Sequence, residues 1–235
     1  MLEVNELNVF IGETEILKNI SLYIEKGEKI GIIGPNGHGK STTLKTISGL
    51  FEPKKGDITF ESKSIVGSNP RKIVELGVTL VAEGGHLFPE MTVLENLLLG
   101  AYTTGAKKYK NENLDKVYSV FPKVKILVKQ KCNSLSGGEL RMVAVGRGIM
   151  TNPKLLMLDE PTLGLAPNLV EDMGEKLHEI GQMGTSVILA DENIDLMADF
   201  AERVYFIENG KINMEGKTTD VLDSDYVKAT YLGLG

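Results

Sequence analysis

The sequence carries, at residues 34–41, the stretch Gly34-Pro35-Asn36-Gly37-His38-Gly39-Lys40-Ser41. This stretch fits the pattern G-x-x-x-x-G-K-[ST], in which glycines let successive backbone N–H groups point inward at phosphate oxygens. An apolar run, Lys29–Ile33, precedes it, and Leu44, Ile47 and Leu50 follow at helical spacing. A strand, a glycine loop and a helix in this order predict a phosphate-binding loop, to which the helix adds the positive end of its dipole.

The side chains at the end of this loop have separate roles. Lys40 supplies a positive charge for the β- and γ-phosphates of a nucleotide, and the Ser41 hydroxyl is placed to ligate Mg²⁺. We assign the whole stretch 34–42 to nucleotide binding, including Thr42 and the variable His38, and expect His38 to be exposed rather than catalytic. The alternative is a glycine-rich turn with a chance Lys-Ser after it, and the flanking strand and helix argue against that alternative.

A pair of acids ends a second apolar run. Leu155–Leu158 predicts a buried strand, and Asp159 and Glu160 follow it directly. Asp159 is placed to hold Mg²⁺ through water, and Glu160 can polarise an attacking water molecule. An acidic turn at a strand end is the alternative for this pair taken alone. The phosphate loop earlier in the chain favours a hydrolytic site that uses a nucleoside triphosphate and Mg²⁺.

The composition limits the class of protein. Of the 235 residues, 42% are hydrophobic and 25% are charged, as in a globular protein with a sizeable core. The net charge of −6 argues against nucleic acid as a partner, because proteins that bind its backbone are usually basic. The single cysteine, Cys132, excludes an intrachain disulfide. With no signal-peptide pattern and no apolar run near the roughly 18 residues of a spanning helix, we expect a soluble chain that reaches a membrane through a partner.

Strand and helix patterns alternate on both sides of a helical middle. Strands are expected within residues 4–11, 20–24, 29–33, 57–60, 78–81, 155–158, 186–190, 204–207 and 211–214, and helices within 168–180 and 194–200. Helical spacing dominates from Thr92 to Ile149, with breaks expected at Gly105, Pro122 and Gly137-Gly138. Asn209-Gly210 is typical of a hairpin turn. This order predicts an α/β core with an inserted helical lobe.

A third motif, Leu135-Ser136-Gly137-Gly138-Glu139, opens a helix ahead of the acid pair. Serine and two glycines at a helix N-terminus make an anion site, although this motif alone also fits a simple helix cap. The order of the three motifs resembles the ABC transporter ATPase family over essentially the whole chain. The resemblance implies a single ATPase domain, 1–235, in the α/β class. It consists of a P-loop NTPase core (1–85 and 150–235) with an N-terminal antiparallel β-subdomain, and an inserted α-helical subdomain at approximately 86–149.

The resemblance also implies how such a site works. Two of these domains pair head to tail and trap two ATP molecules between them, so that each phosphate loop faces the other subunit's signature motif. Ser136, Gly137 and Gly138 would then contact the γ-phosphate of ATP held by the partner. ATP binding closes the pair and hydrolysis opens it, which drives transmembrane permease subunits between two states.

Within this family, four segments resemble one subgroup, the smaller ATPase of branched-chain amino-acid importers. These segments are Ala82–Pro89, Met91–Asn96, Thr162–Pro167 and Ala229–Gly233. Urea and short-amide importers share much of this pattern. The resemblance implies a second ATPase subunit, identical or different, permease subunits and, indirectly, an extracytoplasmic solute-binding protein. It places the chain at the cytoplasmic face of the cell membrane. Phe88 is expected to border the groove for the permease, with ordinary core packing of this region as the alternative.

Several positions depart from the wider family. Glu83 stands where most members have Gln, and we assign it to catalysis and to the metal, because Glu can also ligate Mg²⁺. Glu192 falls where a His usually contacts the γ-phosphate; a carboxylate there is repulsive, so we expect slow turnover or help from a different partner ATPase. Ile11 aligns with the aromatic residue that stacks on adenine, and Phe10, one residue earlier, either stacks or belongs to the core. Ala166 replaces a common Asp at the dimer interface.

Two other classes of function remain as alternatives. A soluble ABC ATPase of DNA repair or ribosome work would usually carry long insertions or two ATPase domains in one chain, and this sequence has neither. A nucleotide-gated regulator that does not hydrolyse ATP is suggested by Glu192. Glu160 argues against the regulator, because a carboxylate at that position serves hydrolysis.

Overall fold

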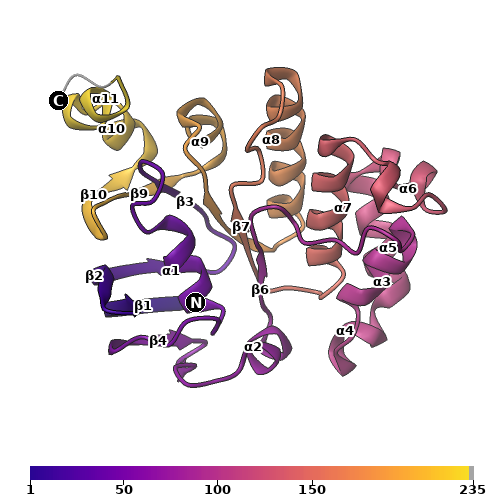
Figure 1. Ribbon diagram of the computed structural model, residues 1–235, viewed down its shortest axis with the longest axis horizontal. Coiled ribbons are helices and arrows are strands. Elements are labelled where there is room, and N and C mark those ends of the chain that lie inside the picture. The colour runs from indigo at the N-terminus through magenta and orange to yellow at the C-terminus, as the bar shows by residue number, and fades with distance from the viewer. Residues whose placement is uncertain (233–235) are drawn as a thin grey trace.

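Two β-sheets organise the computed structural model, which describes residues 1–232 (Figure 1). The first sheet is antiparallel, with its strands in the order β2-β1-β4-β5. Its strands are β1 (Leu2–Ile11), β2 (Thr14–Ile24), β4 (Lys55–Phe60) and β5 (Lys63–Ser64). Buried apolar residues such as Val4, which pairs with Leu22, alternate with exposed ones, so one face of this sheet is covered.

The second sheet has the strand order β10-β9-β3-β8-β7-β6. Its neighbouring strands run parallel except for the hairpin of β9 and β10. Its strands are β3 (Lys29–Ile33), β6 (Val78–Val81), β7 (Leu155–Asp159), β8 (Ser186–Ala190), β9 (Arg203–Glu208) and β10 (Lys211–Lys217). Every residue of β7 and β8 is buried, as is typical of parallel strands covered on both faces.

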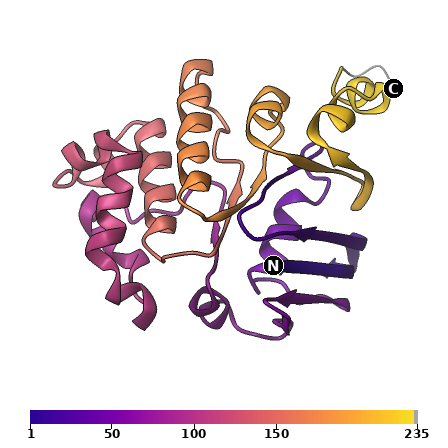
Figure 2. The ribbon, with the colours of Figure 1, turned by 180° about the vertical axis from the view of Figure 1, so that it is seen from behind.

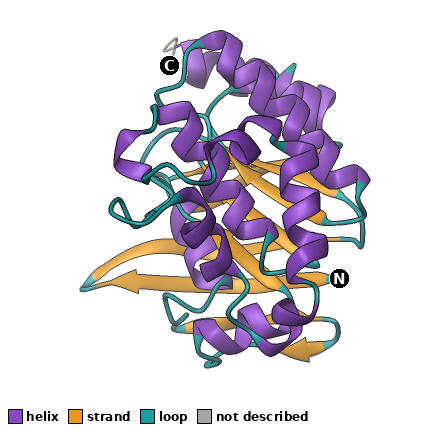
Figure 3. Cartoon of the chain, turned by 90° about the vertical axis from the view of Figure 1, so that its right-hand side faces the viewer, coloured by secondary structure: helices purple, strands orange, loops and turns teal. Residues whose placement is uncertain are grey.

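Helices connect these strands and pack around the second sheet. They are α1 (Lys40–Ile47), α2 (Pro70–Leu76), α3 (Val93–Gly100), α4 (Thr104–Lys108), α5 (Lys110–Val120), α6 (Pro122–Leu127), α7 (Gly137–Ile149), α8 (Pro167–Gln182), α9 (Ile194–Phe200), α10 (Thr218–Leu222) and α11 (Asp225–Leu232), with a 3₁₀ turn at Cys132–Ser134. Helices α3 to α7 gather at one end of the molecule, far from β1, β2 and β4 (Figures 1 and 2). From that end the helices stand in front of most strands (Figure 3).

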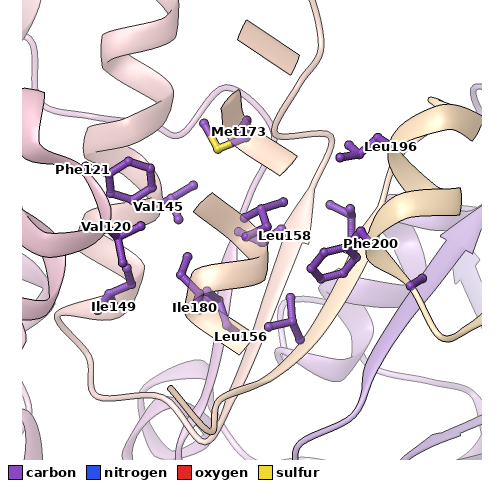
Figure 4. Packing of buried hydrophobic residues seen from close by; sticks show 14 of the residues in the cluster. Val120, Phe121, Val145, Ile149, Leu156, Leu158, Met173, Ile180, Leu196 and Phe200 are labelled. Carbon is purple, nitrogen blue, oxygen red and sulfur yellow. The ribbon is translucent and has the colours of Figure 1, made fainter. Parts of the chain in front are cut away.

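Hydrophobic clusters cover the two faces of the second sheet. Along β7, Leu156 and Leu158 belong to the cluster formed with helices α3 to α11, whereas Leu155 and Met157 belong to the cluster formed with α1, α2 and the first sheet. This alternation follows the two-residue period of a strand. Figure 4 shows part of the first cluster, where Met173 lies near the side chains that project from β7. The sheet is thus fixed from both sides, and its edges can hold a site rigidly.

The element patterns predicted from sequence agree with the structure at most positions. The strands predicted at 29–33, 78–81 and 186–190 have those bounds. The predicted break at Gly105 is wrong, because Gly105 lies inside α4 and Thr103 caps that helix with its side chain. Asn209 and Gly210 have φ of 51° and 77°, as the predicted hairpin turn requires. Within residues 1–232, no helix has the length and hydropathy needed to cross a membrane.

Candidate nucleotide site

The phosphate loop and the predicted acids follow four strands of the second sheet. The loop at 34–41 follows β3, and Glu83 lies two residues after β6. Asp159 ends β7, Glu160 comes next, and Glu192 lies two residues after β8. Because these four strands are parallel, their carboxyl ends meet at one edge of the sheet, which is where open α/β sheets bind ligands. The fold therefore collects residues that lie far apart in the sequence.

Two glycines shape the backbone of the loop. Gly34 has a φ of 149°, and a Cβ atom there would lie 2.0 Å from the Ile207 carbonyl oxygen. Gly39, which precedes α1, has a φ of 115°, and its Cβ would lie 2.8 Å from Leu17 Cδ2. Side chains are thus excluded at both positions. Within residues 1–232, no side chain forms a capping hydrogen bond at the start of α1, so its first N–H groups can bind a phosphate.

Lys40 is buried beside the loop that precedes it. Its Nζ donates a 2.8 Å hydrogen bond to the Gly34 carbonyl and a 3.3 Å hydrogen bond to the Pro35 carbonyl, and it lies 3.5 Å from Asn36 Oδ1. It also lies 3.3 Å from Glu160 Oε1, with only 3% and 9% of the two side chains exposed. A buried ion pair with these extra hydrogen bonds fixes both charges in place. Lys40 therefore links the phosphate loop to the acid after β7.

Asp159 has one satisfied oxygen and one free oxygen. Ser41 Oγ donates a 2.8 Å hydrogen bond to Asp159 Oδ1. The other oxygen, Oδ2, is buried and has no hydrogen-bond partner among residues 1–232. Burial raises the pKa of Asp159 above its ordinary value, against the lowering by the Ser41 hydroxyl and the Lys45 charge. A buried, unpartnered carboxylate oxygen beside a serine hydroxyl needs a positive partner and fits Mg²⁺, which prefers oxygen ligands.

A metal at this position would take only part of its ligand shell from the protein. Across the described residues, no group of three or more His, Cys, Asp or Glu side chains is arranged to hold a metal ion. Mg²⁺ commonly uses one or two carboxylates and completes its shell with phosphate oxygens and water. Glu83 is exposed, and its charge raises the pKa of both Asp159 and Glu160. The residues thus fit a metal that arrives with a nucleotide.

Glu160 is held in an uncommon backbone conformation. Its φ is 46°, in the left-handed region that residues other than glycine rarely adopt, and its N–H donates a 2.8 Å hydrogen bond to the Ala190 carbonyl. Burial raises the pKa of Glu160, while Lys40 opposes that shift. Strained residues and shifted pKa values concentrate at functional sites. A raised pKa also brings a carboxylate nearer to the range that suits a general base.

One cavity of about 390 Å³ joins Glu160 to the loop after β8. Its lining consists of Glu160, Thr162–Leu165, Val170, residues 191–193 and Tyr231. Asp191 is fixed there by hydrogen bonds of 2.6 Å from the Thr162 hydroxyl and 3.0 Å from the Asn193 N–H. Glu192 is exposed and, in the described part of the chain, makes no hydrogen bond or ion pair. The structure thus brings Glu192 to the same cavity as Glu160 with its charge uncompensated.

The two candidates for the adenine contact lie at the end of β1. Ile11 is 46% exposed, next to the turn between β1 and β2. Phe10 is half-buried and belongs to neither hydrophobic cluster of the described residues, so the alternative that Phe10 is a core residue is wrong. The Lys54 ammonium lies 4.6 Å from the centre of the Phe10 ring. Which of the two side chains contacts adenine stays a prediction.

The signature motif lies at the start of α7. Ser136 caps the helix in a capping box with Glu139, and Gly137 has open space where a side chain would stand. Ser136 and Gly137 are exposed, whereas Gly138 is buried. No hydrogen bond or ion pair joins these residues to the loop at 34–41 within residues 1–232, and α1 and α7 stand on different sides of β7 in two views (Figures 1 and 2). One chain therefore leaves this anion site facing outward.

Two residues near the site were not assigned a role from sequence. Arg147, on the signature helix, donates hydrogen bonds to the carbonyls of Gly85 and His86, which follow Glu83. Tyr231, on α11, accepts a 2.9 Å hydrogen bond from the Gly34 N–H. Arg147 lies on the helix that the signature motif opens, so the sequence could have indicated that it lies near the site. For Tyr231 the sequence offered only its place in the closing segment Ala229–Gly233.

Comparisons with known proteins agree with this geometry. A family model described as ABC transporter matches residues 17–163. The high-affinity branched-chain amino acid transport ATP-binding protein BraG of Pseudomonas aeruginosa is 36% identical over 233 residues, covering 99% of this chain and 100% of BraG. Both matches contain all three motifs, because the family model spans residues 17–163 and the alignment with BraG covers 99% of this chain.

Solved structures give the same result. The ADP conformation of MJ1267, an ATP-binding cassette of an ABC transporter, superposes with a TM-score of 0.86 at 31% identity and covers 99% of this chain and 98% of that one. The dimeric post-hydrolysis state of the cassette MJ0796, bound to ADP and Pi, has a TM-score of 0.77 at 26% identity, covering 93% and 99%. The α/β fold with a P-loop core is thus confirmed, and this chain belongs to the ABC transporter family of ATP-binding subunits.

Proposed function

We propose that this chain binds and hydrolyses ATP to power an importer of branched-chain amino acids. The observation that carries the proposal is the buried group at the carboxyl edge of the sheet, where Lys40 pairs with Glu160 and Ser41 bonds to Asp159. These are the residue types that phosphoryl transfer from a nucleotide requires, at the positions where the fold places ligands. The substrate class rests on the printed names of relatives such as BraG.

The residues of the site divide the work of hydrolysis. The N–H groups of the loop at 34–42 and the Lys40 ammonium bind the phosphates. Ser41 and Asp159, with Glu83 nearby, would hold Mg²⁺, which supplies positive charge to the β- and γ-phosphate oxygens. Glu160 orients water and accepts its proton, and its raised pKa favours this transfer. Glu192 lies at the same cavity, where its negative charge opposes a γ-phosphate and slows turnover.

The complete site contains two chains. The signature motif lies at the start of α7, where Ser136 and Gly137 are exposed and Gly138 is buried. Within residues 1–232, no hydrogen bond joins the motif to the phosphate loop of the same chain. A head-to-tail partner brings a second signature helix to each phosphate loop, and the helix N-terminus then binds the γ-phosphate. The solved structure of MJ0796 with ADP and Pi is dimeric, which supports this arrangement. The partner is a second copy or a related ATPase.

The chain reaches the membrane through permease subunits on the cytoplasmic face, and a solute-binding protein delivers the amino acid on the other side. Phe88 is 52% exposed and follows by two residues His86, which lines a groove with Leu99 and Tyr102, and an exposed aromatic ring there offers a permease segment an apolar contact. We treat residues 86–149 as the helical subdomain that carries this contact and the signature motif together. A closing movement of the pair would then be passed to the permease.

The direct test is ATP hydrolysis by the chain assembled with its permease in proteoliposomes. Glu160→Gln should lower the rate by about 100-fold or more, the range of a lost general base, while Mg²⁺-ATP still binds. Glu61→Gln is the matched control, because Glu61 forms only an exposed ion pair with Lys154. With the solute-binding protein present, leucine, isoleucine or valine should stimulate hydrolysis, and urea should not. A Glu160→Gln variant that hydrolyses at the wild-type rate contradicts the assignment.

A further inference from the structure

The C-terminal helix α11 reaches back to the first residue of the phosphate loop. The Tyr231 hydroxyl accepts a 2.9 Å hydrogen bond from the Gly34 N–H, across 197 positions of sequence. On the other side of the same residue, Lys40 Nζ donates a 2.8 Å hydrogen bond to the Gly34 carbonyl. Gly34 is therefore held at both of its backbone polar groups, by one side chain from the loop and one from the end of the chain.

The Gly34 N–H has little room to move to another acceptor in place of the Tyr231 hydroxyl. It is buried, and its α-carbon lies so close to β9 that a Cβ would approach the Ile207 carbonyl oxygen to 2.0 Å. A buried N–H needs an acceptor, and Tyr231 is the one that the described residues supply. Without the hydroxyl, the Gly34 peptide must turn toward water or stay unpaired. Either change moves the peptide from which the phosphate loop starts.

The surroundings of Tyr231 fix its hydroxyl at this place. Its ring packs on Phe206 of β9, with ring centres 6.4 Å apart. Burial, together with the charges of Glu192 and Asp191, raises the pKa of Tyr231 to about 12 against the lowering by the Gly34 N–H. The phenol is therefore neutral at working pH, and it lines the same cavity as Glu160 and Glu192. Tyr231 thus bonds to the phosphate loop from the end of the chain and lines a cavity with the acidic loop after β8.

We propose that Tyr231 is a positioning residue, which holds the phosphate loop in the conformation that binds nucleotide phosphates by accepting the Gly34 N–H bond. This inference rests on the proposed nucleotide function and adds a residue outside the three motifs. Phosphate binding depends on several N–H groups that converge on one point, so a small shift of the loop weakens all of them together. The docking of α11 then influences how tightly the chain binds ATP and ADP.

The test compares two tyrosines of the same helix. Tyr231→Phe keeps the ring on Phe206 and removes only the hydroxyl that meets Gly34. Tyr226→Phe is the matched control, because its ring also packs on Phe206, at 5.8 Å, while its hydroxyl contacts Glu208 and Asn213. Calorimetric titration gives the affinity and stoichiometry for Mg²⁺-ADP, and thermal unfolding reports the stability of each variant. Hydrogen exchange resolved at single amides follows Gly34 directly.

The expected result is specific to one variant. Tyr231→Phe should weaken Mg²⁺-ADP binding by about fivefold or more, the effect of one lost hydrogen bond, with unchanged stoichiometry. The Gly34 amide should exchange faster in this variant, and Tyr226→Phe should match the wild type in both measurements. A merely structural role would lower the unfolding temperature or the stoichiometry and leave the affinity of the folded fraction unchanged.

Several results would overturn the inference. Equal ADP affinity in Tyr231→Phe and the wild type contradicts it, as does equal weakening in both variants, which would point to a general effect of losing a hydroxyl from α11 rather than to the Gly34 bond. If Tyr231→Phe does not fold, the wild type alone decides: a Gly34 amide that exchanges as fast as an unprotected glycine contradicts the proposal. A wild type that binds no ADP at all contradicts the nucleotide function itself, so the two failures can be told apart.

Discussion

Glu160 and Glu192 line one cavity but differ in their surroundings. Glu160 is buried and paired with Lys40, so its charge is compensated and its position is fixed. Glu192 is exposed and adds negative charge on the side where a γ-phosphate is expected to lie. We therefore expect the two carboxylates to have opposite effects on hydrolysis, with Glu160 taking a proton from water and Glu192 repelling the nucleotide.

The charge of Glu192 can be removed without changing its size. Glu192→Gln should raise the ATPase rate of the assembled pair by roughly two- to fivefold, the effect of one exposed charge contact. The measurement is steady-state hydrolysis at saturating ATP. Glu215→Gln, an exposed carboxylate on β10, is the control and should have no effect. An unchanged rate for Glu192→Gln would show that this side chain does not face the γ-phosphate.

Asp159 carries a stability cost that should be visible in the protein without nucleotide. Its pKa in the folded state is raised by burial, so the folded state binds more protons than the unfolded state between the two pKa values. Stability therefore falls as the pH rises through that interval. Asp159→Asn should raise the unfolding temperature at pH 7 by about 2–4 °C, equivalent to about 1 kcal/mol for a chain of this size.

The same variant should lose Mg²⁺-dependent nucleotide binding, because the metal ligand is gone. Its gain in unfolding temperature should shrink as the pH is lowered through the raised pKa of the folded state and then the ordinary aspartate pKa, below which Asp159 is protonated in both states. Asp115→Asn, on the exposed face of α5, is the control and should show no gain. A lower unfolding temperature for Asp159→Asn at pH 7 would mean that the carboxylate is stabilised in the fold.

At the scale of elements, apolar patterns located the strands that carry the site. The strands β3, β6 and β8 have the predicted bounds because each is a short buried run between turn residues. Helix α2 was not predicted, although Asn69 caps it and Pro70 opens it, because it has seven residues and buries only Ile73. The extent of β2 was underestimated because Leu17 and Ile20 lie three residues apart, and Asn19 between them, with a φ of 58°, breaks the two-residue alternation of a strand.

The start of α7 offers a clean test of the signature motif. Gly137 has no atom within 4 Å of the place where a Cβ would stand, so Gly137→Glu should fold as the wild type does. Its carboxylate would point outward, where a partner's γ-phosphate is expected. Repulsion between like charges across an interface costs several kcal/mol, so hydrolysis should fall by more than about 100-fold. Steady-state ATP hydrolysis and thermal unfolding are the measurements.

The matched control lies in another helix. Gly105 also stands in a first helical turn with open space around it, in α4. Gly105→Glu should leave both hydrolysis and the unfolding temperature unchanged. If Gly137→Glu hydrolyses ATP like the wild type, the signature motif does not meet a nucleotide, and the capping-motif alternative is favoured.

At the scale of the whole molecule, the exposed apolar residues point to contact with a membrane partner. Phe88→Ser should reduce co-purification with the permease and uncouple transport while sparing basal hydrolysis, because Phe88 is 52% exposed and lies outside the cavity of Glu160. Ile126→Ser is the control, since Ile126 is 80% exposed on α6. Loss of nucleotide binding in Phe88→Ser would instead indicate a role in folding.

Most of the candidate site could be predicted from the sequence, and one long-range contact could not. The loop, Asp159 and Glu160 were predictable because each follows a buried strand, and parallel strands bring their carboxyl ends to one edge. The bond between Gly34 and Tyr231 was not, because it depends on how α11 docks across 197 positions of sequence, and local periodicity carries no signal for that.

The central claim is that the phosphate loop of one chain works with the signature motif of another. The measurement is ATP hydrolysis by Lys40→Ala and Gly137→Glu, assayed separately and then mixed, with the wild type as reference. Each variant alone should be nearly inactive, whereas the mixture forms pairs in which one intact loop meets one intact signature. The mixture should recover up to about one quarter of the wild-type rate, since half of the randomly formed pairs hold one working site of two. Where the wild-type reference shows that two copies of this chain form an active pair, a mixture no more active than its separate components, or a single variant that keeps the wild-type rate, would contradict the account.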